Sequence, residues 1–461
     1  MARDLLKRSN LSPERIRLGE FGIVTMRKRF YLKRVFQLVI ATFLGWCPLV
    51  CLSQDLVQEF DPINKGLGLM GVANNGSFFV LGGNGISLRW TQSGEEWLNI
   101  TEDVEFHSNT SHRPVDISPD DSLMAWVGGG MVRIFDLKLG RIISRFSKLS
   151  DDQSYFRGPI KFQPNSNRIA VSSYGTNEVA IVNYSSGEIV QRIHHPQSDP
   201  KRGNIDFSYD GHLLTYGGGS RGRNTLVHVF DLKEHKTVRV IKTSTSYGVT
   251  DIDLSDNGKW LATATLNGIE NEDSMVEIWD IQKGDVFGRI KGSCAFLHFM
   301  DKGSFLAVLR TLGSQGEDTL PDQVQFWRVH DMKLMKSIEL EGRRGEYPAR
   351  YTMQGFADDS GVMVQYRGST KWIEENGEFQ PVKPTYVAVV STPPMISHFS
   401  VLSQNSLSIK WAGGKPPFDL LFRSQLNERW ITQKEGINDR EVTIQQNHQG
   451  VGFYGIQGKN P

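Results

Sequence analysis

Hydrophobic residues alternate with polar ones in short runs along most of the chain, and residues 250–290 hold one complete unit of this pattern. Ile252 and Leu254 alternate with polar residues up to a turn at 256–258, and residues 260–264 form a compact apolar run. After a loop, residues 276–280 and 286–290 return to the period of two. This period places one face of an extended strand inward, so the unit predicts four consecutive β-strands.

The unit recurs between about residues 66 and 383 at intervals of about 45 residues, the period of a four-stranded propeller blade. Turns rich in Asp, Asn, Gly and Ser begin at residues 74, 120, 165, 210, 256, 301 and 358. The third strands are predicted at 88–90, 134–136, 181–183, 229–231, 278–280, 326–328 and 371–373. Both series count seven, so the predicted fold class is all-β, with a seven-bladed β-propeller over residues 54–383.

Three of the predicted third strands end in an aromatic residue and Asp, namely Phe135-Asp136, Phe230-Asp231 and Trp279-Asp280. Together with residues 117–121, which read Ile-Ser-Pro-Asp-Asp, they resemble the WD-repeat family of β-propellers. The Gly-His pair of that family and the Asp before its third strand are missing, so its hydrogen-bonded tetrad is not carried over. The resemblance implies a scaffold that binds other proteins and seldom an enzyme.

Closure of the ring has two readings. Residues 55–60 resemble the fourth strands predicted at 141–146 and 188–193, so a strand from the N-terminus is expected to complete the last blade and remove its open edge. The alternative is that residues 378–382 close that blade.

The first 53 residues predict export. Residues 1–34 contain ten Lys and Arg against three acidic residues, and residues 35–53 carry no charge. This order is typical of a signal peptide, with cleavage expected before Gln54 and a periplasmic, cell-surface or extracellular protein as the product. The alternative is an uncleaved membrane anchor with the propeller outside. Met26 is a second candidate translation start beside Met1.

Charge and cysteine usage exclude some classes of partner and stabilisation. Without residues 1–53 the chain has 42 basic and 48 acidic residues, a net charge of about −6, and no basic stripe interleaved with aromatic residues. Nucleic acid is therefore not an expected partner. Cys47 and Cys51 lie in the predicted signal, so Cys294 remains alone and internal disulfides are not expected.

A second unit follows the propeller. Pro384, Pro393 and Pro394 mark a linker at 384–394, and residues 395–461 contain further alternating runs, such as 406–411. This region resembles an immunoglobulin-like or fibronectin type III-like β-sandwich with Trp411 in its core. The sequence stops where a last strand is expected, so the sandwich is either trimmed or completed from elsewhere.

No catalytic residue, metal ligand or cofactor site is predicted. Ser220 has the spacing of a nucleophile elbow, but a strand follows it where that motif needs a helix. His194 and His195 are adjacent on an extended chain and point apart, and Asn271-Glu272-Asp273 lacks the pattern of a calcium loop. A small propeller enzyme, a lactonase or a sugar-acting hydrolase or lyase, remains the alternative function.

The predicted functional residues lie on one rim of the propeller, formed by the loops that enter each first strand and those that join second and third strands. Arginine with nearby aromatic residues is typical of protein-binding hot spots. The rim residues are Arg113, Arg157, Arg202, Arg221, Arg223, Arg350, Tyr155, Phe156, Tyr247 and Tyr351, with Glu270, Glu272 and Asp273 on an acidic side. The hypothesis is an exported, non-catalytic scaffold for a protein or peptide partner; a structural part of an envelope assembly is a further alternative.

Overall fold

The computed structural model describes residues 57–59, 68–83, 85–102, 104, 114–147, 155–174, 178–194, 204–217, 226–244, 248–265, 274–292, 294–310, 323–340, 352–357, 359–367, 371–375, 378–382, 385–392, 395–403, 406–412, 418–423, 431–445 and 453–458. The predicted signal or anchor at 1–53 lies outside this part of the chain. Within the described residues, no helix has the length and apolar character needed to span a membrane.

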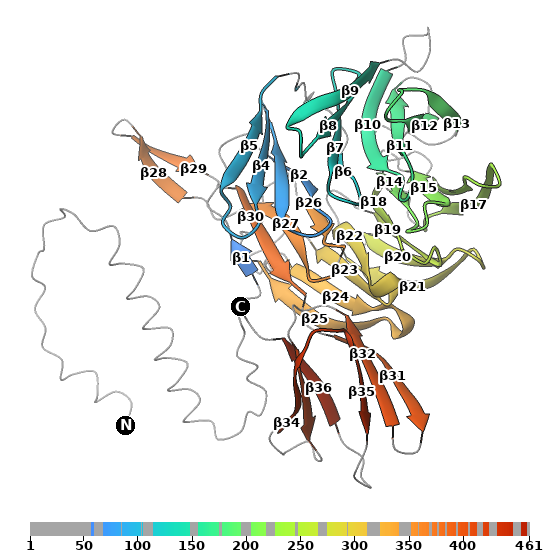
Figure 1. Cartoon of the computed structure of the whole chain (residues 1–461), viewed down its shortest axis with the longest axis vertical. Helices are drawn as coiled ribbons and strands as arrows, with labels where there is room; N and C mark the ends of the chain where they lie inside the picture. The colour runs from blue at the N-terminus through green and yellow to red at the C-terminus, as the bar shows by residue number, and fades with distance from the viewer. Residues whose placement is uncertain are drawn as a thin grey trace, which may run out of the picture. The chain divides into compact units, whose positions relative to one another are not determined.

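Seven antiparallel four-stranded sheets form the blades of a β-propeller (Figure 1). Blades 1 to 3 are β2 (Gly68–Val72), β3 (Phe78–Gly82), β4 (Ile86–Trp90), β5 (Glu96–Ile100); β6 (Val115–Ile117), β7 (Leu123–Gly128), β8 (Met131–Asp136), β9 (Arg141–Ser147); and β10 (Tyr155–Phe162), β11 (Arg168–Tyr174), β12 (Glu178–Asn183), β13 (Ile189–His194). Blades 4 to 6 are β14 (Asn204–Phe207), β15 (Leu213–Gly217), β16 (Leu226–Asp231), β17 (Lys236–Lys242); β18 (Val249–Leu254), β19 (Trp260–Thr265), β20 (Met275–Asp280), β21 (Asp285–Lys291); and β22 (Cys294–Met300), β23 (Phe305–Arg310), β24 (Gln323–Arg328), β25 (Lys333–Glu339).

Blade 7 is closed by the N-terminal strand, as one of the two readings of the sequence predicted. Its strand order is β26 (Thr352–Gly355), β27 (Gly361–Arg367), β30 (Thr385–Ser391) and β1 (Val57–Glu59), and Val57 lies opposite Val390. Residues 378–382 do not close the blade, because they form β29 (Glu378–Val382), which pairs with β28 (Lys371–Glu375) in a separate hairpin.

Two further expectations for blade 7 need correction. The predicted third strand at 371–373 belongs to the inserted hairpin, and the true third strand is β30, which pairs with β27 along all of its length. Residues 385–391, which the sequence places in the linker at 384–394, are therefore part of the propeller, and the propeller extends to Ser391.

The hydrophobic core is divided into seven clusters, each shared by two neighbouring blades. The cluster between blades 4 and 5, for example, joins Val229 of β16 to Leu261 of β19 and Trp279 of β20. Alternate residues of a strand point to opposite faces of its sheet, so the middle strands of a blade contribute to both neighbouring clusters. Burial of one such side chain contributes roughly 1.5–3 kcal/mol to the free energy of folding. Each of the seven blade junctions therefore contributes to the stability of the ring.

The aromatic–Asp pairs have a local physical role. Phe135, Phe230 and Trp279 are buried, while the Asp that follows each of them closes the turn into the fourth strand. The Asp136 carboxylate accepts the main-chain N–H groups of Lys138 and Leu139, at 2.9 and 2.7 Å. Asp231 and Asp280 accept main-chain N–H groups in the corresponding turns of blades 4 and 5.

After the propeller, the described residues contain six strands, which form two three-stranded sheets. One contains β31 (Met395–Ser403), β32 (Ser406–Ala412) and β35 (Glu441–Gln445); the other contains β34 (Ile431–Ile437), β33 (Phe418–Arg423) and β36 (Phe453–Gly458). Trp411 of β32 is 2% exposed and meets the Phe418 ring edge-on, with the ring centroids 5.3 Å apart. The prediction that Trp411 lies in the core of this region is confirmed.

Candidate functional site

The first strands of the seven blades surround the propeller axis, and each contacts the first strands of its two neighbours. Every one of them carries a residue at the same place, two positions before the residue that opens the turn to the second strand. We call this set the inner ring. Its members in blade order are Gly71, Asp116, Lys161, Asp206, Asp253, His298 and Gln354.

Three carboxylates of the inner ring hold the next blade through its main chain. The donors and distances are Phe162 N to Asp116 at 2.7 Å, Leu254 N to Asp206 at 2.8 Å and Phe299 N to Asp253 at 2.5 Å. In each case the donor directly follows the inner-ring residue of the next blade. All three Asp residues are buried, and hydrogen bonds from fixed N–H groups offset the desolvation of a carboxylate.

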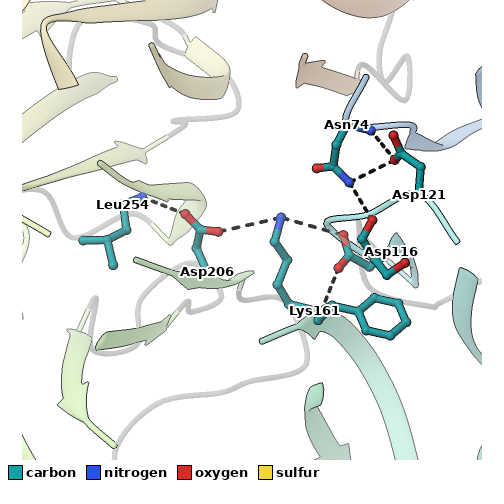
Figure 2. Close-up of polar contacts among 8 residues, drawn as sticks. Asn74, Asp116, Asp121, Lys161, Asp206 and Leu254 are labelled. Atoms are coloured by element: carbon teal, nitrogen blue, oxygen red, sulfur yellow. Dashed lines mark hydrogen bonds and ion pairs between the residues drawn. The ribbon is translucent and has the colours of Figure 1, made fainter. Parts of the chain in front are cut away.

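Lys161 occupies the inner ring between two of these carboxylates (Figure 2). Its Nζ lies 3.7 Å from Asp116 of blade 2 and 3.8 Å from Asp206 of blade 4. The Lys161 ammonium group can only donate hydrogen bonds, so it cannot accept a main-chain N–H as the inner-ring Asp residues do. It forms an ion pair with the carboxylate on each side instead. Blades 2, 3 and 4 are thereby joined through one side chain.

His298 of blade 6 also contacts the next blade. Its ring lies over Gly355, which directly follows the inner-ring residue of blade 7. A Cβ on Gly355 would come within 1.7 Å of His298 Cδ2, so only glycine fits there. Two residues before the inner-ring position, Asn204 of β14 donates a hydrogen bond from its side-chain amide to Asp251 of β18. Asp251 also accepts a hydrogen bond from Leu297 N of blade 6, at 2.9 Å. These contacts extend the inter-blade hydrogen bonding into a second row.

The turns between first and second strands form a third row of inter-blade contacts. Asp121 of blade 2 accepts the main-chain N–H groups of Asn74 and Asn75 of blade 1, at 2.6 and 3.0 Å, and the Asn74 amide contact is drawn in Figure 2. Asp359 of blade 7 accepts Asp301 N of blade 6 at 3.0 Å. Burial raises the pKa of Asp359 to about 7, against the lowering effect of that hydrogen bond.

The chemistry of this site is that of fixed acceptors. A carboxylate held by the main chain of the next blade keeps one orientation, and its hydrogen bond supports the blade junction. Among the described residues, no group of three or more His, Cys, Asp or Glu side chains is placed to hold a metal ion. The hydrogen bonds of the inner ring join neighbouring blades and stabilise the junctions between them.

Most of the predicted rim residues lie outside the described part of the chain, namely Arg113, Arg202, Arg221, Arg223, Arg350, Tyr247, Tyr351, Glu270, Glu272 and Asp273. Tyr155 and Phe156 begin β10, which also contains the backbone of Arg157. Tyr155 is 37% exposed and lies against Gly130 in the turn between β7 and β8. Phe156 is buried in the cluster between blades 2 and 3, so its predicted role as a surface contact needs correction.

Sequence reasoning missed the inner ring. The signal for it is a polar residue in the middle of an apolar triplet, as in Val115-Asp116-Ile117, Ile160-Lys161-Phe162, Ile205-Asp206-Phe207 and Ile252-Asp253-Leu254. Alternation alone assigns such a residue to solvent. Its position on the first strand of a closed ring gives it an inter-blade role instead.

The chain is similar to several known proteins. The family model described as eukaryotic translation initiation factor eIF2A matches residues 149–294, which span blades 3 to 5. The structure of the RRP9 WD40 repeats is 12% identical, with a TM-score of 0.51, and the match covers 73% of this chain and 97% of that one. Hydrazine synthase from Kuenenia stuttgartiensis is 17% identical, with a TM-score of 0.44 and coverage of 57% and 76%. The chain thus contains a seven-bladed β-propeller, a fold that it shares with the RRP9 WD40 repeats.

Proposed function

We propose that the chain is an exported, non-catalytic propeller scaffold that binds a protein or peptide through the rim defined above, without the buried Phe156. The observation that carries this proposal is the use of the inner-ring carboxylates. Asp116, Asp206 and Asp253 each accept a main-chain N–H from the next blade, so these groups serve the ring itself. Recognition then falls to the rim, where Tyr155, the first residue of strand β10, is exposed.

The fold supports the same function. A propeller presents many loops on a rigid ring, and loops on rigid scaffolds commonly carry binding residues. The WD40 likeness supports the fold, and Arg and Tyr at the rim are residue types enriched at binding hot spots. The matched family model bears the name of a translation initiation factor, but we do not propose that role here, because the basic and then apolar first 53 residues favour export.

Affinity capture with cross-linking tests the proposal. The chain would be used as bait in its own cell envelope, beside an Arg113→Glu/Arg157→Glu/Arg202→Glu variant. We expect a partner that is captured by the unchanged chain and lost with the variant. Lys138→Glu/Arg141→Glu/Arg145→Glu, on the exposed outer side of blade 2, is a charge-matched control that should keep the partner. Equal capture by the rim variant, at an unchanged melting temperature, would reject the rim as the binding face.

Export itself is tested separately. Cell fractionation and N-terminal sequencing of the mature protein should give a chain that begins at Gln54 outside the cytoplasm. A membrane-bound chain that keeps residues 35–53 would support the anchor instead, and a cytoplasmic chain would reject both.

The region after the propeller is proposed to be an immunoglobulin-like or fibronectin type III-like sandwich that spaces or supports the propeller. The two sheets β31-β32-β35 and β34-β33-β36 and the buried Trp411 support this assignment.

A further inference from the structure

The outer strand of blade 4, β17, differs from the other described outer strands. Its sequence is Lys-Thr-Val-Arg-Val-Ile-Lys, and of its seven residues only Ile241 is buried. Val238 is 37% exposed and Val240 is 53% exposed. Each of β9, β13, β21 and β25 carries one large exposed hydrophobic residue, namely Ile143, Val190, Phe287 and Leu334.

Charge separates β17 further. Lys236, Arg239 and Lys242 give it three cationic side chains and no acidic one. The next most basic described outer strand, β9, has Arg141 and Arg145, while the two lysines of β25 are accompanied by Glu339. Strand β17 therefore combines exposed β-branched residues with the largest positive charge among these edges.

The edge is also firmly held. Arg239 donates to the main-chain carbonyl oxygens of Ile281, at 3.0 Å, and of Gln282, at 2.5 Å, in the turn of blade 5. A bulge lies at Val238, between the pairs Thr237–Phe230 and Arg239–Val229, and from Arg239 to Lys242 the pairing with β16 is regular. On its other side β17 is the last strand of its sheet, so this stretch presents a regular backbone edge.

We propose that the edge of β17 is a docking site for an acidic, extended polypeptide segment that adds to blade 4 as a fifth strand. Main-chain hydrogen bonds to an exposed sheet edge provide affinity in this mode of recognition, and side chains provide specificity. Val238 and Val240 supply apolar contacts, and Lys242 pairs with a carboxylate of the incoming strand. Lys236 does the same by exchanging its exposed partner Glu234, which lies 3.8 Å away, for a carboxylate of that strand. A second copy of β17 is disfavoured, because lysines on an edge strand oppose pairing between like-charged strands. This surface is distinct from the rim and does not depend on the function proposed for it.

Synthetic peptides test this site on the full-length chain. The probe is a fluorescein-labelled peptide of sequence EVEVEVE, compared with KVKVKVK and with EVEPEVE, whose proline removes a main-chain donor. We expect the acidic peptide to bind with a Kd below about 100 μM in low salt, measured by fluorescence anisotropy. Binding should slow hydrogen exchange of the amides at 236–242, and the other two peptides should bind weakly.

Two variants of β17 make the test specific. Lys236→Glu/Lys242→Glu should weaken binding at least about tenfold through charge repulsion, and Val238→Ser/Val240→Ser should weaken it at an unchanged salt dependence. Arg141→Glu/Arg145→Glu on β9 is the matched control and should bind like the unchanged chain. Absence of binding, equal binding of KVKVKVK, or insensitivity to the β17 variants would each overturn the proposal. A dimer in analytical ultracentrifugation that Val240→Lys dissociates would assign the edge to a second copy instead.

Discussion

At the scale of single residues, Lys161 places a cation between two buried carboxylates of neighbouring blades. Replacing Lys161 with Met removes the cation from beside both Asp116 and Asp206. Because an uncompensated buried charge is costly, we expect the free energy of unfolding to fall by about 1–3 kcal/mol, measured by denaturant titration. Lys161→Arg keeps the charge and should retain most of the stability. Equal stability of the Met variant would show that the two ion pairs contribute nothing net.

Gly355 gives a second prediction, because the His298 ring occupies the place where a Cβ would lie. Gly355→Ala must displace His298 or separate blades 6 and 7, so we expect a loss of about 1–3 kcal/mol of stability. The double variant His298→Ala/Gly355→Ala should regain part of this loss, since the ring is then absent. If the two substitutions were simply additive, the contact would not be the cause.

Asp359 predicts a pH dependence. Burial raises its pKa from 3.8 to about 7. Between these two pH values the Asp359 carboxyl keeps its proton in the folded state and has lost it in the unfolded state. The stability linked to this proton is fully present below the unfolded pKa and is lost as the pH rises through about 7. Asp359→Asn keeps the acceptor for Asp301 N and cannot ionise. Between pH 5 and pH 8 it should show a smaller loss of stability than the unchanged chain, by on the order of 1–2 kcal/mol. An identical pH profile for the two proteins would contradict the shifted pKa.

At the scale of elements, β1 completes blade 7 through pairing with β30. A chain that begins at Asp61 lacks this strand and exposes the edge of β30. We expect a lower melting temperature and association at high concentration, because unpaired edges promote pairing between chains. A peptide of residues 54–60 added in trans should reverse both effects, and a scrambled peptide should not. A truncated chain with unchanged melting behaviour would mean that the strand is dispensable.

Blade 7 also shows where prediction from the sequence failed. The strand signals around Trp372 and the Asn376-Gly377 pair are those of a regular hairpin, and β28 and β29 do pair with each other, but they are inserted between β27 and β30. The true third strand, β30, lacks the aromatic–Asp ending, because the fourth strand of blade 7 is β1 and no turn leads from β30 into it. The prolines that flank β30 in the sequence also favour a linker. Period and turn chemistry predict a local hairpin well, whereas its place in the ring depends on non-local pairing.

The other six blades were predictable because each is built from local signals that repeat. The turn residues and the aromatic–Asp pairs act within a few positions, as the hydrogen bonds of Asp136 illustrate. The inner ring was not predictable in the same way. Asp206 binds Leu254 N across 48 residues, and a polar residue in a strand gives no local sign of that partner.

At the scale of the whole molecule, the propeller and the region that follows have separate hydrophobic cores. The seven inter-blade clusters end with Val390, and a further cluster from Ile409 to Val442 belongs to the C-terminal strands alone. Independent cores predict independent folding. A chain that ends at Thr392 should therefore keep the propeller, with its calorimetric transition within about 3 °C of that in the full chain. The full chain should show a second, smaller transition that the truncated chain lacks. Unfolding of the truncated chain, or a single transition in the full one, would mean that the C-terminal strands support the ring and are more than a spacer.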